Sequence, residues 1–246
     1  MEGWKVKMFH IKIAEVIIEI DNKYEEVYNR CKEYAVSANS QPDICITATN
    51  DEIDAGKKWF LAYENRIVSD GYAEFSQIHH NVYAQLPFFD AFWMHAVAVS
   101  MKESCYAFTA PGGYGKSTHG KLWVERWPQQ AQIINGDNPI IRRQNGSFFA
   151  YGTPFCGKEG YNVNIGRPLR GLCYLRHGTH NSIRKMDSSI AYSQLLRDSF
   201  VYVTDKNAEQ LMTLLEEFVA TVPVYQLTCN QEIEAAEVAY EGMRNG

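Results

Sequence analysis

The chain has 246 residues, of which 46% are hydrophobic and 13% aromatic, so it can bury a substantial core. A formal net charge of −5 argues against a protein that works on nucleic acid or on an anionic membrane surface. There is no apolar run of membrane-spanning length, no signal-peptide pattern at the N-terminus and no CxxC pair among the six scattered cysteines. We therefore expect a cytoplasmic protein with reduced cysteines and no structural metal site.

The first third of the chain alternates short strands and helices. Apolar periodicity predicts strands within 8–20 and over 43–47, and helices over 22–36, from 51 onwards and over 72–85. The adjacent His79 and His80 lie on the last of these helices and point apart. We expect them at the surface rather than in a metal site.

The remainder of the chain reads as a larger α/β core. The expected elements are an apolar segment over 89–99, strands over 105–109, 131–137, 140–143, 147–151, 169–175 and 222–228, and helices over 119–127, 190–198, 208–218 and 231–243. The turn at 144–146 favours a hairpin. We predict a single α/β domain, with an N-terminal α/β portion over 1–88, a core over 89–246, and a mixed sheet flanked by helices.

The most informative stretch is a glycine-rich segment between a predicted strand and a predicted helix. In a P-loop, backbone N–H groups at a helix N-terminus bind phosphates, and glycines let the backbone approach them. A lysine reaches the β- and γ-phosphates, and a hydroxyl holds Mg²⁺. The candidate nucleotide-binding residues are Gly112, Gly113, Tyr114, Gly115, Lys116, Ser117 and Thr118. Ala110 replaces the expected first glycine and needs a negative φ there; the alternative is a turn that binds nothing.

A phosphate-binding loop needs an acidic partner, and Asp137 follows the first strand after the predicted helix. Acids at strand ends of α/β sheets fall on the ligand-binding edge, so Asp137 is a candidate metal ligand, with Ser117, or a general base. The alternative is an ordinary turn aspartate before Pro139.

These motifs together resemble the nucleotide-binding core shared by HPr kinase/phosphorylase and ATP-dependent phosphoenolpyruvate carboxykinase. His95 matches a histidine before the P-loop hairpin, residues 113–118 match the Gly-x-Gly-Lys-Ser/Thr element, and Asp137 matches the first of two aspartates. Asn138 replaces the second, and residues 168–172 resemble an Arg-Gly-Leu segment of HPr kinases. The resemblance covers roughly residues 90–180 and implies a P-loop core of this type.

The resemblance also implies roles for two more residues. His95 would interact with the active-site acid, although a core histidine is the alternative, and Arg170 would neutralise phosphoryl charge unless it is only an edge-strand arginine. The glycine-rich loop 152–161 carries Lys158 and Glu159 and is predicted to be a mobile lid over the acceptor, with a rigid connecting turn as the alternative.

The expected function is an ATP- and Mg²⁺-dependent phosphotransferase that acts on a hydroxyl of a small metabolite or of a peptide or protein serine. A carboxykinase-like reaction would need a second metal with histidine and lysine ligands that the sequence does not assemble. Ala110 and Asn138 favour a different alternative, a nucleotide-binding sensor or scaffold without turnover. The pattern does not choose between ATP, GTP and pyrophosphate as donor, and leaves the oligomeric state open.

Overall fold

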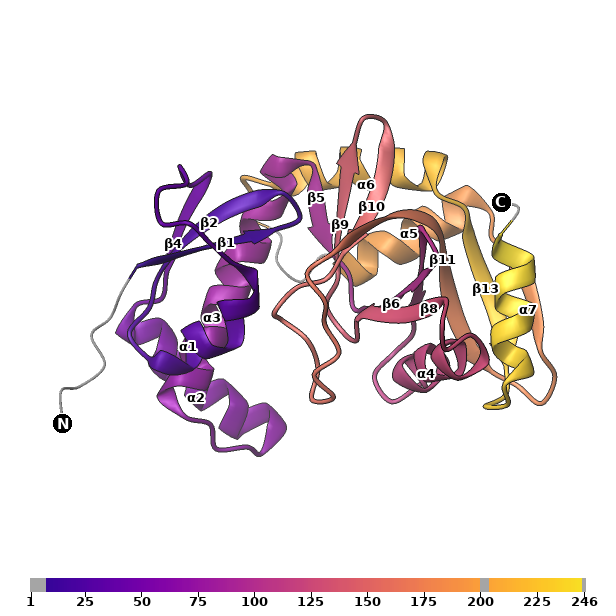
Figure 1. Ribbon diagram of the computed structural model, residues 1–246, viewed down its shortest axis with the longest axis horizontal. Helices are drawn as coiled ribbons and strands as arrows, with labels where there is room; N and C mark the ends of the chain where they lie inside the picture. The colour runs from indigo at the N-terminus through magenta and orange to yellow at the C-terminus, as the bar shows by residue number, and fades with distance from the viewer. Residues whose placement is uncertain (1–7, 200–203, 245–246) are drawn as a thin grey trace. The chain divides into compact units, whose positions relative to one another are not determined.

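The computed structural model describes residues 8–199 and 204–244. Contacts between residues divide the chain into two compact units at the junction of Gln85 and Leu86, near the expected transition at 88. Both units mix helices and strands (Figure 1).

The N-terminal unit is a four-stranded sheet, in the order β3-β1-β2-β4, with three α-helices and a short 3₁₀ helix. Its elements are β1 (Phe9–Ile13), β2 (Val16–Asp21), α1 (Glu25–Cys31), η1 (Lys32–Tyr34), β3 (Ala35–Val36), β4 (Ile44–Thr47), α2 (Asn50–Glu64) and α3 (Asp70–Gln85). A capping box starts α2, because the Thr49 hydroxyl accepts from the Glu52 backbone N–H while the Glu52 carboxylate accepts from the Thr49 backbone N–H. The predicted strands and the α2 and α3 helices are confirmed.

Two expectations for this unit need correction. The helix predicted over 22–36 is shorter, because Ala35 leaves the helical conformation and pairs with Ile11 of β1. His79 is half-buried rather than at the surface, since its ring packs edge-on against Tyr83 with centroids 4.1 Å apart, whereas His80 is exposed. Burial lowers the pKa of His79 to about 3.

The C-terminal unit is built on a nine-stranded mixed sheet within the described residues. Its main path runs β5-β9-β10-β11-β7-β6-β8, while β13 pairs with β11 and with β12. The strands are β5 (Ala91–Trp93), β6 (Ala96–Met101), β7 (Ser104–Thr109), β8 (Ala131–Asn135), β9 (Ile140–Gln144), β10 (Ser147–Tyr151), β11 (Gly166–His177), β12 (Ser182–Lys185) and β13 (Val224–Cys229). The other elements are η2 (Leu86–Phe89), α4 (Lys116–Arg126), α5 (Ser188–Ser199), α6 (Ala208–Thr221) and α7 (Glu234–Met243). The expected mixed sheet with flanking helices is therefore present.

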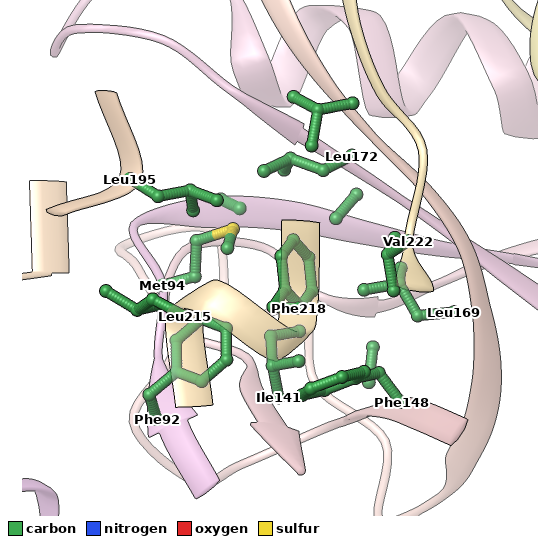
Figure 2. Packing of buried hydrophobic residues seen from close by; sticks show 14 of the residues in the cluster. Phe92, Met94, Ile141, Phe148, Leu169, Leu172, Leu195, Leu215, Phe218 and Val222 are labelled. Atoms are coloured by element: carbon green, nitrogen blue, oxygen red, sulfur yellow. The ribbon is translucent and has the colours of Figure 1, made fainter. Parts of the chain in front are cut away.

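Helices cover both faces of this sheet. Successive residues of a strand point to opposite faces, so one strand contributes side chains to the core on each side. In β6, Ala96 and Ala98 face the cluster formed with α5 and α6, whereas Val97 and Val99 face the cluster formed with α4 and α7. Figure 2 shows the first cluster, where the Phe218 ring lies between Phe92 and Phe148, at 5.4 and 5.1 Å between centroids. Such aromatic contacts contribute about 0.5–1.5 kcal/mol each beyond the burial of area.

Strand register brings several strand ends to one edge of the sheet. β7 pairs antiparallel with β6, so that Ala96 lies opposite Thr109, and parallel with β11, so that Tyr174 lies opposite Thr109. β11 continues in parallel register with β13 as far as His177 opposite Cys229. The segment that follows Thr109 therefore lies between the start of β6 on one side and the carboxyl ends of β11 and β13 on the other.

Candidate functional site

The glycine-rich loop, residues 110–115, joins the end of β7 directly to α4, as the sequence predicts. Gly113 and Gly115 have φ of +77° and +85°, the left-handed conformation that favours glycine, and Gly115 is the N-cap of α4. Ala110 is not among the described residues with positive φ, in agreement with the expectation for an alanine. A Cβ added to Gly112, Gly113 or Gly115 would meet no atom within 4 Å, so the space above the loop is open.

The first turn of α4 supplies the donors that an anion would need. His119 N–H donates to Gly115 O at 2.8 Å, and by helix geometry the N–H groups of the three preceding helical residues have no partner inside the helix. Lys116 is buried, with 7% of its surface exposed, and its ammonium donates to Ala110 O at 3.0 Å. Burial lowers the pKa of Lys116, and the nearby Asp137 carboxylate acts in the opposite direction.

Asp137 lies in a small polar cluster beside this lysine. His95 Nε2 is 3.1 Å from Asp137 Oδ1, and Asn138 Nδ2 donates to Asp137 Oδ2 at 3.0 Å. The backbone N–H groups of Asp137 and Asn138 both donate to the Asn135 side-chain oxygen, at 2.9 and 2.7 Å, which fixes the turn after β8. His95 is held at the start of β6, because Thr109 Oγ1 donates to His95 O at 2.9 Å. The structure thus brings Lys116, His95 and Asp137 together.

The residues of this cluster fit a magnesium ion that is bound mainly through nucleotide phosphates. Ser117, half-buried in the first turn of α4, supplies a hydroxyl and Asp137 supplies a carboxylate, the oxygen ligands that Mg²⁺ prefers. Across residues 8–199 and 204–244, no group of three or more His, Cys, Asp or Glu side chains could hold a metal ion. Ser117 and Asp137 would supply two oxygen ligands to such an ion.

Arg170 does not join this cluster. A bulge in the pairing of β11 with β7 falls between Leu169, opposite Cys105, and Gly171, opposite Tyr106, so Arg170 lies near the first residues of β7. Its side chain is exposed, and its Nε is 3.4 Å from Ser104 Oγ. Because β7 runs from Ser104 to the glycine-rich loop, Arg170 lies at the opposite end of that strand. It is not an edge-strand arginine either, since β11 pairs with β7, β10 and β13.

The loop 152–161 lies against the Asp137 cluster. Its two ends are tied down, because Gly152 N–H donates to Ile165 O at 3.1 Å and Gly136 N–H donates to Tyr161 O at 2.9 Å. Phe155 is only 1% exposed, so the first half of this glycine-rich segment is part of the core. The exposed part is 158–161, and a Cβ on Gly157 would lie 3.2 Å from Asp137 Cβ.

Lys158 and Glu159 form the exposed tip of this loop. Glu159 accepts from Lys121 of α4 at 2.8 Å, and the Lys121 ammonium lies 5.9 Å from the centre of the Tyr161 ring. Hydrogen bonding to Glu159 raises the pKa of Lys121. These contacts do not test the prediction that this loop is a lid. They do restrict any movement of the loop to its tip.

The opposite side of the glycine-rich loop carries two histidines, His177 and His119, that the sequence did not single out. Tyr114 stacks on His177, the last residue of β11, with centroids 4.9 Å apart and planes inclined by 35°. His119 is buried, packs on Phe108 at 4.5 Å and accepts a hydrogen bond from the Trp123 indole N–H at 3.1 Å. Burial lowers the pKa of His119 to about 3. His119 could have been identified from the sequence by its position in the first turn after Lys116. Nothing in the sequence marks His177, because only the register of β11 places it beside the loop.

No protein-family model matches the sequence, and no curated protein sequence matches it either. Among solved structures, the chain is similar to the Hpr(Ser) kinase/phosphatase from Coxiella burnetii, with 10% sequence identity and a TM-score of 0.35. That similarity covers 62% of this chain and 94% of the other. It is a distant structural likeness, and by itself it assigns no activity to this chain. Within the part of the chain that the structure describes, none of the helices has the length and apolar character needed to span a membrane.

Proposed function

We propose that this protein is a nucleotide-dependent phosphotransferase, with ATP and Mg²⁺ bound at the glycine-rich loop and a hydroxyl as the phosphoryl acceptor. The observation that carries the proposal is the meeting of the buried Lys116 ammonium with the His95–Asp137 pair at the loop between β7 and α4. A cation beside a phosphate-binding backbone stabilises transferring charge, and a carboxylate next to it is placed to receive the acceptor's proton.

In this proposal each side chain has a defined task. The α4 N-terminus and Lys116 bind the phosphates, and Ser117 would hold Mg²⁺, which would neutralise phosphate charge. Asp137 accepts the hydroxyl proton, with a role beside Ser117 as metal ligand as the alternative. An imidazole nitrogen that faces a carboxylate donates to it, so His95 fixes the orientation of the Asp137 carboxyl group. The acceptor is a small metabolite or a peptide or protein serine.

A second candidate is a nucleotide-binding sensor that does not turn over. It is favoured by the amide of Asn138, which donates to Asp137 Oδ2 at the position where a second carboxylate would add a metal ligand. With His95 on the other oxygen, both acceptor atoms of Asp137 already have a partner.

The test is to measure nucleotide binding and γ-phosphate transfer side by side, with Mg²⁺ and a panel of hydroxyl metabolites and serine peptides. We expect wild-type protein to bind ATP and label an acceptor, and Lys116→Ala to lose about 10²–10³-fold in transfer. Lys116→Arg is the matched control that keeps a cation. Binding with no turnover on any acceptor would establish the sensor, and absence of nucleotide binding would contradict both candidates.

A further inference from the structure

A shallow pocket lies beside the glycine-rich loop on the side away from Asp137. It is bounded by Tyr114 of the loop and Thr118 of α4, and by His177 and Asn230 at the carboxyl ends of β11 and β13. Leu122 and Leu175 give it an apolar lining. It therefore combines an apolar surface, polar groups and an aromatic rim next to a loop that can bind phosphate.

His119 belongs to this lining and offers a hydrogen bond that nothing in the described chain accepts. An indole N–H is only a donor, so the Trp123 contact requires His119 Nε2 to be the unprotonated acceptor. The neutral ring then carries its proton on Nδ1. That nitrogen is buried, and no acceptor for it exists among the described residues. Buried donors are normally paired, so this one points to a ligand acceptor.

The rim of the pocket is suited to stacking. Tyr114 is 43% exposed and lies against His177, which is also exposed, so the two rings present an aromatic surface beside the loop. Arg176, exposed at the same strand end, adds a cation to the lining. Heteroaromatic bases stack on such surfaces, and a larger ring system gains more contact area.

The orientation of a bound nucleotide follows from the difference between the Asp137 side and the pocket side of the loop. In the proposed function the terminal phosphate lies by Lys116 and Asp137, so the phosphate chain runs along the loop towards Thr118 and the nucleoside leaves on the far side. Thr118 borders the pocket there.

We propose that this pocket binds the base of a purine nucleotide, which stacks on Tyr114 and His177 and accepts a hydrogen bond from His119 Nδ1 through a ring nitrogen. The proposal rests on the proposed function and deepens it, since it assigns the selectivity for the base to residues that take no part in phosphoryl transfer. Inorganic tripolyphosphate, which has the phosphates without the base, then uses only the loop.

The first experiment compares the affinities of the wild-type protein for ATP, UTP and inorganic tripolyphosphate by calorimetry in the presence of Mg²⁺. We expect ATP to bind at least tenfold more tightly than tripolyphosphate and more tightly than UTP. Equal affinity for all three would overturn the purine pocket and leave the phosphate loop standing. Binding of none of them would overturn the pocket together with the proposed function.

The second experiment uses variants of the rim. Tyr114→Ala and His177→Ala should each weaken ATP about 5- to 100-fold, as expected for loss of one stacking ring. His177→Ala, which lies outside the phosphate-binding loop, should leave tripolyphosphate within twofold. His180→Ala, an exposed histidine outside the pocket, is the matched control and should change neither. Equal weakening of ATP and tripolyphosphate by His177→Ala, or no weakening of ATP by either rim variant, contradicts the proposal.

The third experiment isolates His119. His119→Asn keeps a donor near the Nδ1 position, whereas His119→Gln keeps an acceptor for the Trp123 indole and removes that donor. We expect the glutamine variant to lose about tenfold in ATP affinity and the asparagine variant to lose less. The reverse order would overturn the assigned hydrogen bond. Since His119 is buried, circular dichroism must first show that both variants are folded; the rim variants decide the proposal if they are not.

Discussion

The two sides of the glycine-rich loop use the same residue type in opposite ways. On one side, towards β6 and β8, the half-exposed His95 faces a carboxylate, with 42% of its side chain accessible. On the other, towards β11 and β13, His119 is 3% exposed and bonded to an indole, so its ring is neutral. The side with His95 and Asp137 is suited to binding charged groups and transferring a proton. The side with His119 is suited to binding an uncharged ring. The difference shows that the surroundings of a histidine, not its presence next to a motif, decide its chemistry.

The largest expected effect is on the Asp137 side. Asp137→Asn keeps an oxygen for His95 but removes the base, and should lower phosphoryl transfer by about two to four orders of magnitude while sparing nucleotide binding. Single-turnover transfer and binding of Mg²⁺–nucleotide are the measurements. Asp54→Asn, an exposed aspartate of α2, is the control.

Two other results would change the role of Asp137. An equal loss in Mg²⁺–nucleotide affinity would make it a metal ligand rather than a base. An unchanged transfer rate would show that Asp137 is an ordinary turn residue. The Asp137 side of the loop would then contain no catalytic group.

The next effect concerns the His119 side and is a pH dependence of stability. The folded pKa of His119 is near 3 and the unfolded value near 6.5, so the unfolded chain binds the extra proton between these values. The contribution of His119 is complete above about pH 6.5 and is lost as the pH falls, by about 2 kcal/mol at pH 5.

Urea unfolding at pH 7.5 and pH 5.0 measures this loss. In His119→Gln the difference between the two pH values should shrink by about 2 kcal/mol relative to wild type. His79→Gln should reduce it similarly, because burial also lowers the pKa of His79 to about 3. A pH difference that is the same in His119→Gln and in wild type would show that His119 is not kept neutral.

The smallest expected effect is at the tip of the loop 152–161. Removing its ion pair with α4 by Glu159→Gln should raise amide exchange over 157–161 by only a few-fold, because exposed pairs contribute little. Glu237→Gln, which removes the other exposed ion pair of α4, with Arg126, is the matched control and should leave this loop unchanged.

The same exchange measurement tests the lid. Binding of nucleotide and acceptor should increase protection at the tip if the loop closes over the acceptor and excludes water. Protection that is already high in the free protein and unchanged by ligands would leave a rigid connection between β10 and β11.

The sequence by itself determined the local features of this protein. The strand β7, the glycine-rich loop and α4 follow from apolar patterning and from glycines at two positive-φ positions, and the hairpin of β9 and β10 follows from Asn145 and Gly146, both with positive φ. These signals act over a few residues, so they can be read without the fold. The helix predicted over 22–36 was shortened because pairing of Ala35 with β1, a contact between distant residues, overrode local propensity.

Only the tertiary structure decided which side chains meet around the loop. The pairing of β6 with β8 brings His95 to Asp137, and the bulge and parallel register of β11 put Arg170 at the far end of β7 and His177 beside Tyr114. A strand's register is set by the packing of its neighbours, and a shift of one residue moves every side chain to the other face. The candidate phosphate loop and its acidic partner Asp137 could therefore be found from the residues alone, whereas the aromatic neighbour His177 could be assigned only once the strands were aligned.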